Sequence, residues 1–255
     1  MKTNYMLTIA GSDVLSGGGL QADLATFHHF HLFGFLALTS IATLSNNGFE
    51  ITSIDEVVFQ KQLDSLKAVD FSAIKIGLLP NESIAERTLT FLKAKKEIPV
   101  ILDPVLVFKE NNDEEISTMR EVLLSFFPYT TVITPNLKEA ELLSGVNITN
   151  LTDMKKAAKI LYEAGARIVV IKGGSRLDKT RAIDLFYDGE HYVDLQKPLL
   201  SMNNTGAGCT FASTLSSYIA KGESPLLATR HAKEFVYQAI ANANEYGVLQ
   251  QDEKN

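Results

Sequence analysis

The sequence predicts an α/β protein with a mainly parallel central sheet and helices on both faces. Six apolar runs of strand length alternate with longer segments of helical period, and this alternation continues to Lys172. Strands that alternate with helices pair in parallel, since each helix carries the chain back to the edge where the next strand starts. The chain has 255 residues, 45% of them hydrophobic, which is enough for one large core. We therefore expect a single domain over residues 1–255.

The expected elements follow in chain order. Buried strands are predicted at the runs YMLTIA, FLALTSIATL, AIKIGLL, VILDPV, TVITPN and RIVVIKGG. Apolar residues recur every three or four positions in the segments between them, which predicts helices over residues 21–33, 56–69, 82–96, 114–126, 137–144 and 153–164. Thr152 is the expected N-cap of the last of these helices.

The rhythm changes after Lys172. The stretch RAIDLFYDGEHYVDLQ has two alternating runs about an Asp-Gly pair, which predicts a small antiparallel hairpin at the edge of the sheet. Two helices, over residues 207–221 and 225–246, then close the chain. Gly222 is expected to end the first helix and Ser224 to cap the second.

Composition and charge narrow the class of partner. A net charge of −6 and a pI near 5.4 provide no basic surface for a nucleic acid. One cysteine cannot form an internal disulfide, which agrees with a reducing compartment. The start of the chain has no cleavage-site pattern, and no hydrophobic segment is long enough to cross a membrane. We expect a cytoplasmic protein with small-molecule ligands and neither a nucleic-acid nor a membrane partner.

The segment NNTGAGCTFAS, residues 203–213, is the main candidate for an anion site. Gly206, Ala207 and Gly208 are small and precede a helix, whose first N–H groups lack internal partners and attract anions such as phosphate. Cys209 would lie in the first turn, where the helix field lowers the pKa of a thiol. Such a thiolate could accept a proton from a substrate hydroxyl. The alternative is that Cys209 is a small core residue and that the glycines only turn the chain.

The glycine cluster GGGLQA, residues 17–22, has two interpretations. It matches the dinucleotide fingerprint G-x-G-x-x-A, which would indicate a nicotinamide enzyme, but the second apolar run is followed by SNNGF rather than by an acidic residue that would hold a ribose. A plain glycine turn is the alternative. The motif HHFH has too few nearby ligands for a metal site, and a solvated helix face is the better interpretation.

Polar residues also follow the predicted strands, at the edge where ligands bind in parallel sheets. Asp103 and Glu139 are carboxylates suited to Mg²⁺ when a nucleotide supplies further oxygens, although each could be a helix cap or a surface charge. Lys172 could contact a polyphosphate, or it could simply be solvated.

With these motifs in hand, the chain resembles the hydroxymethylpyrimidine kinase and pyridoxal kinase branch of the ribokinase superfamily. The motifs LTIAGSD, GGGLQAD, KIGLL, LDPVLVFK, VITPNLKEAELLSG, VIKGG, DLFYDG and NNTGAGCTFAS carry the resemblance, from about residue 6 to about residue 240. It implies a ribokinase-like fold, homodimers, and transfer of the γ-phosphoryl group from MgATP to the exocyclic CH₂OH of a heteroaromatic ring.

The resemblance also implies a role for each matching residue. Cys209 would be the catalytic base, and the backbone of Gly206, Ala207, Gly208 and Cys209 would stabilise the phosphoryl group as it transfers. Asp103 and Glu139 would hold Mg²⁺ and water. The ATP-binding residues would be Asn136, Lys172, Gly174, Thr205 and Gly208, with the base against the final helices and the hairpin turn. The residues of the substrate pocket would be Gly11, Ser12, Asp23, Leu44, Leu78 and Val105, and Asp23 would hydrogen-bond the ring.

Three departures bear on the substrate. Leu44 stands where pyrimidine kinases commonly have Gln or Glu, and GAGCT is closer to the pyridoxal kinases of this branch than to the GTGCT of pyrimidine kinases. Phe108 stands in the lid segment where some pyridoxal kinases have a second cysteine, which excludes capture of an aldehyde by a lid thiol. We expect an ATP-dependent pyridoxal, pyridoxine or pyridoxamine kinase of vitamin B6 salvage. The alternatives are a hydroxymethylpyrimidine (phosphate) kinase and a non-catalytic vitamin-binding protein.

Overall fold

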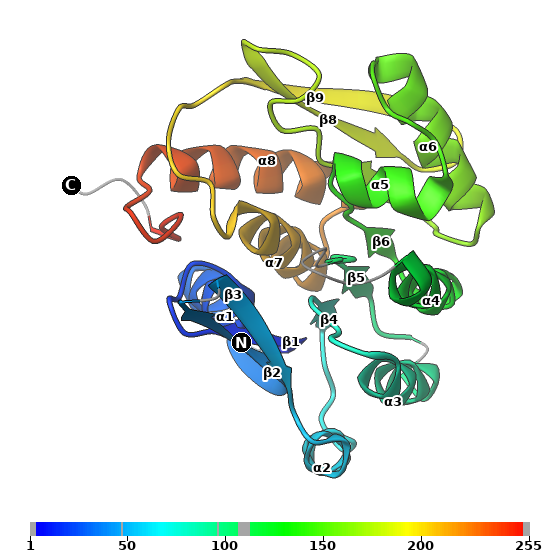
Figure 1. Ribbon diagram of the computed structural model, residues 1–255, viewed down its shortest axis with the longest axis vertical. Helices are drawn as coiled ribbons and strands as arrows, with labels where there is room; N and C mark the ends of the chain where they lie inside the picture. Colours follow the sequence, from blue (N-terminus) through cyan, green and yellow to red (C-terminus); the bar gives the residue numbers. More distant parts are fainter. Residues whose placement is uncertain (1–3, 47, 96, 107–112, 252–255) are drawn as a thin grey trace.

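A computed structural model describes residues 4–46, 48–95, 97–106 and 113–251. In this part of the chain one sheet has the strand order β3-β2-β1-β4-β5-β6-β7-β8-β9 (Figure 1). The strands from β2 to β7 in this order run parallel, and β3, β8 and β9 are antiparallel to their neighbours. The strands are β1 (Tyr5–Asp13), β2 (Phe33–Ser45), β3 (Gly48–Ser53), β4 (Ala73–Ile76), β5 (Val100–Leu102), β6 (Val132–Ile133), β7 (Val169–Ile171), β8 (Arg181–Tyr187) and β9 (Tyr192–Pro198).

The helices cover both faces of the sheet, as the alternation predicts (Figure 1). They are α1 (Gly19–His29), α2 (Glu56–Ser65), α3 (Glu82–Lys93), α4 (Asp113–Leu124), α5 (Leu137–Ser144), α6 (Leu151–Glu163), α7 (Ala207–Ala220) and α8 (Pro225–Ala241), with a 3₁₀ turn at Phe127–Tyr129. None of the helices in the described ranges has the length and apolarity that a membrane span requires.

Two apolar clusters hold these layers together. Neighbouring strand residues point to opposite faces, so Met6 packs with α1, α7 and α8, whereas Leu7 packs with the helices on the other face. Ile101 and Leu102 on β5 divide in the same way. All four side chains are fully buried. Burial on both faces explains why the central strands read as continuous apolar runs.

Several details differ from the sequence-based expectations. An additional strand, β3, pairs antiparallel with β2 and forms the second edge of the sheet. Asn150, and not Thr152, caps α6, because the Asn150 side chain accepts a hydrogen bond from the Asp153 amide (3.0 Å). Helix α1 begins at Gly19 and ends at His29 instead of spanning residues 21–33, and α2 ends at Ser65 instead of residue 69. Helix α8 ends at Ala241 instead of residue 246. The chain beyond α8 instead turns back towards the start of α7.

The order of the strands creates a crevice. Strand β1 lies between β2 and β4, so the chain pairs β2 on one side of β1 and then crosses over to place β4 on the other side. Ligands of parallel α/β sheets bind where the strand order reverses in this way, beyond the carboxyl ends of the strands. The functional site is therefore expected above the ends of β1 and β4.

Candidate active site

The start of α7 is locked against the glycine loop between β1 and α1. Gly206, the N-cap of α7, has φ +82°, and a Cβ atom added there would lie 1.7 Å from the carbonyl oxygen of Gly17. Only glycine fits such a conformation and such a close approach. The GGG segment thus supports the start of α7, a role that the dinucleotide interpretation does not include.

The predicted catalytic cysteine lies at this junction. A Cβ atom added to Gly18 would lie 3.8 Å from the Sγ atom of Cys209, and the Gly19 amide donates a hydrogen bond to that sulfur. Burial raises the pKa of the Cys209 thiol, although Lys75 and the Gly19 amide act in the opposite direction. The sequence-based expectation of a lowered pKa is therefore wrong, because loss of solvent is the largest effect on this thiol.

Asp103 and Lys172 form an ion pair in front of α7. The Lys172 Nζ atom lies 2.6 Å from Asp103 Oδ1, and the Thr134 hydroxyl donates to the same oxygen (3.2 Å). A Cβ atom added to Gly208 would lie 3.2 Å from Lys172 Nζ and 3.9 Å from Asp103 Oδ2, so the pair faces the first turn of the helix. Burial lowers the pKa of Lys172, but Asp103 and Glu139 raise it above the ordinary value. Lys172 is therefore charged.

Glu139 caps a helix and also belongs to this charged group. Its Oε2 atom accepts from the Asn136 amide (2.7 Å) while its own amide donates to Asn136 Oδ1 (2.9 Å), which is a capping box at the start of α5. Burial raises the pKa of Glu139 to about 7, the Asp103 carboxylate adds to this effect and Lys172 opposes it. The helix-cap alternative is therefore confirmed, but it does not exclude the second role.

The pair Asp103 and Glu139 has the chemistry expected of a magnesium site. Both are hard oxygen donors and both are buried. Burial is the main cause of the raised pKa of Glu139, and a cation beside the carboxylate would oppose it. Within residues 4–46, 48–95, 97–106 and 113–251, no group of three or more His, Cys, Asp or Glu side chains could hold a metal. A cation here would take its remaining ligands from water and a nucleotide.

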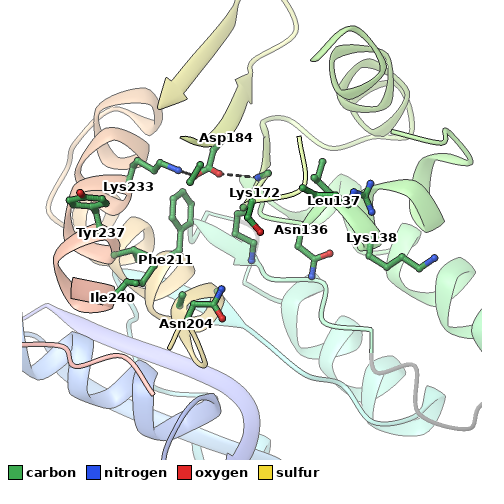
Figure 2. A pocket seen from close by; sticks show the side chains of 18 residues that line it. Asn136, Leu137, Lys138, Lys172, Asp184, Asn204, Phe211, Lys233, Tyr237 and Ile240 are labelled. Atoms are coloured by element: carbon green, nitrogen blue, oxygen red, sulfur yellow. Dashed lines mark hydrogen bonds and ion pairs between the residues drawn. The ribbon is translucent and has the colours of Figure 1, made fainter. Parts of the chain in front are cut away.

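A pocket of about 470 Å³ extends from Lys172 to α8. Figure 2 shows Phe211, Tyr237 and Ile240 on one side of the pocket, facing Asn136 on the other. Apolar walls with a few polar groups are typical of a nucleotide-sized site. Of the predicted ATP-binding residues, those that line the pocket are Asn136, Lys172, Gly174 and Gly208. The fifth, Thr205, follows Asn204, which also lines it.

The resemblance implied that the nucleotide base lies against the final helices, but it named no residue of α8. Lys233, Val236, Tyr237 and Ile240 line it from α8, and they follow the spacing of one helix face, which is the signal that could have found them. Lys233 Nζ lies 2.8 Å from one carboxylate oxygen of Asp184 on β8 (Figure 2). The other oxygen of Asp184 accepts a hydrogen bond from the Gly173 amide (3.0 Å), just after Lys172. This link between β8 and the end of β7 is not visible in the sequence.

Five of the six predicted substrate residues lie at or near the carboxyl ends of strands, and the sixth, Asp23, does not. A Cβ atom added to Gly11 would lie 3.5 Å from Leu78, so these two residues meet at the ends of β1 and β4, and Ser12 accepts a hydrogen bond from Gln21 there (2.8 Å). Val105 is half-buried just beyond Asp103. Leu44 is 61% exposed at the end of β2. Phe108, in the predicted lid, lies outside the described residues.

The geometry corrects the role expected for Asp23. Its side chain is fully buried, one oxygen accepts from Thr8 (2.6 Å) and Lys75 (2.8 Å), and the other accepts from Ser213 (2.5 Å). A carboxylate so enclosed cannot reach a ring in the crevice. The resemblance to the kinase family implied a role at the ring, but the turn of α1 carries the Asp23 side chain into the interior.

Comparison with known proteins agrees with this geometry. Residues 13–252 match the phosphomethylpyrimidine kinase family. The chain is similar to the pyridoxine kinase of Bacillus subtilis (38% identity, covering 96% of this chain and 94% of that protein). It is also similar to the hydroxymethylpyrimidine/phosphomethylpyrimidine kinase of Bacillus subtilis (37% identity, 92% and 89%).

The fold shows the same relationship. The pyridoxal kinase from Staphylococcus aureus, solved in complex with AMP-PCP and pyridoxal, superimposes with a TM-score of 0.91 at 38% identity and covers 98% of this chain and 94% of that one. The predicted ribokinase-like α/β fold, with its edge hairpin, is therefore confirmed. By the extent of these matches in sequence and structure, the chain belongs to the phosphomethylpyrimidine kinase family.

Proposed function

We propose that this protein is an ATP-dependent kinase that phosphorylates the 5′-hydroxymethyl group of pyridoxal, pyridoxine or pyridoxamine. The observation that carries the proposal is the meeting of three groups: the start of α7 with Cys209, the Asp103–Lys172 pair, and the pocket of about 470 Å³ beside them. A phosphoryl donor in that pocket would direct its terminal phosphate towards the helix.

The lining of the pocket supports a nucleotide as the phosphoryl donor. We assign the nucleotide base to the apolar wall formed by Phe211, Tyr237 and Ile240, and the phosphates to Lys172 and the first turn of α7. The Ala207 amide already donates to the carbonyl of Asn204 (3.1 Å), so the amides that follow it in the first turn are the ones left to hold the transferring group. Fixed donors of this kind stabilise the charge of the transition state at little cost of reorganisation.

Cys209 is the group best placed to accept the substrate proton. In the proposed step the sulfur, as a thiolate, forms an S–H bond as the substrate O–H bond breaks. The freed oxygen bonds to the γ-phosphorus of ATP while the bond from that phosphorus to the bridging oxygen breaks, and ADP leaves. Mg²⁺ held by Asp103 and Glu139 would neutralise charge on the phosphates. The raised pKa of the Cys209 thiol means that the base form grows with rising pH.

The substrate is tested by turnover. We expect MgATP to be consumed faster with pyridoxal or pyridoxine than with hydroxymethylpyrimidine, measured as ADP release at equal acceptor concentrations. The similarity to the pyridoxine kinase and to the structure that contains pyridoxal supports this order, as does Leu44. Absence of ADP release with all three acceptors would contradict the proposal and favour a binding protein.

A second candidate is a hydroxymethylpyrimidine or phosphomethylpyrimidine kinase. The family match and the 37% identity to the Bacillus subtilis enzyme of that name favour it specifically. The same machinery would serve this reaction, because both acceptors present a CH₂OH group on a heteroaromatic ring. The assay above distinguishes the two candidates by the ratio of their kcat/KM values.

We further propose that the chain forms a homodimer and works in the cytoplasm. Large apolar side chains are exposed along β2 and just after β1, at Val14, Leu15, Phe33, Leu36 and Leu44, and a second copy would cover them. The mass of the protein in solution, measured by light scattering, tests the dimer. The single cysteine agrees with a reducing compartment, and fractionation of cells tests that location.

A further inference from the structure

A buried ion pair lies on the interior side of Cys209, and the reaction as derived above does not use it. Lys75 on β4 and Asp23 on α1 are both fully buried, with Nζ 2.8 Å from Oδ2. The hydroxyls of Thr8 and Ser213 complete the hydrogen bonding of the carboxylate. Removing two charges from water costs more than their attraction commonly returns, so such a pair is a poor device for stability alone.

The geometry connects this pair to the catalytic turn. Ser213 follows Cys209 by one helical turn, so both side chains leave the same face of α7, and Ser213 donates to Asp23 (2.5 Å). Helix α7 also packs directly on β4. A Cβ atom added to Gly77 would lie 2.9 Å from Lys75 Nζ, which places the ammonium at the end of β4 that opens into the crevice.

Four charged groups act on the sulfur of Cys209. Lys75 from β4 favours the thiolate, whereas Asp23 from α1 and Asp103 beyond β5 oppose it. Lys172 beyond β7 also interacts electrostatically with the sulfur. The pKa of Lys75 is lowered by burial, but Asp23, Cys209 and Asp103 raise it above the ordinary value, so the ammonium stays charged. Lys75 is thus a permanent positive charge in a site with little solvent to screen it.

We propose that Lys75 is a positioning residue, fixed by Asp23, Thr8 and Ser213, whose ammonium balances the negative charge on the sulfur of Cys209 when the thiolate forms. Because Lys75 is fully buried, it would touch neither acceptor nor nucleotide and would act only through Cys209. The proposal rests on the proposed function in one respect, the use of Cys209 as a base. The pairing of the two charges stands without it.

The single cysteine allows a direct test. Iodoacetamide modifies thiolates, and Cys209 is the only thiol in the chain, so the alkylation rate of the full-length protein without nucleotide, measured against pH, reports this sulfur alone. We expect Lys75→Met to slow alkylation at pH 8 by about tenfold or more, and Asp23→Asn to accelerate it. A merely structural role would move both variants in the same direction, towards the rate of an exposed cysteine, and this result would overturn the proposal.

Two further variants protect the test from loss of folding. Lys75→Met leaves Asp23 buried without its cation, so the double variant Lys75→Met/Asp23→Asn, which removes both charges, is measured beside it. Lys75 acts on the sulfur more strongly than Asp23 does, so we expect the double variant to alkylate more slowly than the wild type. Equal rates would overturn the proposal. The control is Lys233→Met, which breaks an equally short and nearly buried pair with Asp184 and should leave the alkylation profile unchanged.

Turnover gives the second readout. In the double variant we expect kcat to fall by about tenfold or more with the KM for ATP unchanged, and the rise of kcat with pH to move to higher pH. An unchanged kcat profile beside slower alkylation would overturn the catalytic part of the proposal. Full activity of a Cys209→Ala variant would contradict the base role in the proposed function, whereas the alkylation rates would still decide whether Lys75 balances the sulfur.

Discussion

Replacement of Cys209 by alanine removes only the Sγ atom from the first turn of α7. The Cβ atom stays, so the contact with the glycine loop at Gly18 and the left-handed N-cap at Gly206 are kept. The residue as a whole is half-buried although its sulfur is enclosed, and loss of that one atom should lower the free energy of unfolding by about 1 kcal/mol. The pocket that we assign to ATP is lined by other side chains.

These facts set the size of the expected effect. Loss of a general base costs about 10²-fold or more in kcat, which corresponds to about 3 kcal/mol of transition-state stabilisation. The KM for ATP should stay close to that of the wild type. The raised pKa of the thiol also sets a sign: the base form is scarce at neutral pH and grows as pH rises, so wild-type kcat should increase above pH 7 and the Cys209→Ala rate should not.

The assay is steady-state ADP release with saturating pyridoxal, measured between about pH 6 and pH 9. Thermal unfolding of the wild type and of Cys209→Ala is measured beside it. A kcat for Cys209→Ala within about threefold of the wild type, at unchanged Tm, would refute the assignment of the base. A loss of activity that follows the loss of Tm would also refute it, because the sulfur would then be structural. The base role of Cys209 requires that turnover fall while the fold and ATP binding are kept.

Three further outcomes test the site. Folding raises the pKa of Glu139 to about 7, so the contribution of this carboxyl group to stability is complete below the unfolded value of 4.5 and is lost as pH rises through 7. The loss amounts to up to about 3 kcal/mol, and Glu139→Gln should reduce it when urea unfolding is measured at acid and alkaline pH. An unchanged dependence of stability on pH in the variant would contradict this prediction. Gly206→Ala should abolish turnover and lower Tm far more than Gly222→Ala does, because the new methyl group at Gly206 meets Gly17. Gly222 is the control, since it has a similar φ (+91°) but an added Cβ atom there would meet nothing within 4 Å. Equal effects of the two substitutions would show that backbone strain alone matters. Leu44→Gln should shift the ratio of kcat/KM values towards the pyrimidine, and a constant ratio would show that Leu44 does not select the ring.

Much of the fold and part of the site follow from local patterns. Parallel strands end at one edge, so residues directly after apolar runs must gather, and Asp103, Asn136 and Lys172 do so. The second edge strand was missed although Gly48 begins a run that alternates, because the run is short and half-exposed. The final helices were expected beside the nucleotide base, but the α8 residues that line the pocket were not identified, because they are ordinary for a buried helix face.

The buried charges could not be predicted at all. Asp23 and Lys75 are 52 residues apart, and nothing in either segment indicates that β4 and α1 bring them together. The same limit explains the wrong sign for the Cys209 thiol. A helix terminus is a local feature that the sequence reveals, whereas burial depends on the glycine loop and α7 closing over the sulfur. Burial also excludes the water that would screen Lys75, so the enclosure that raises the pKa of the thiol makes a fixed ammonium beneath it more effective. The pKa of the Cys209 thiol therefore depends on how the interior is packed, so it has to be measured in the folded protein.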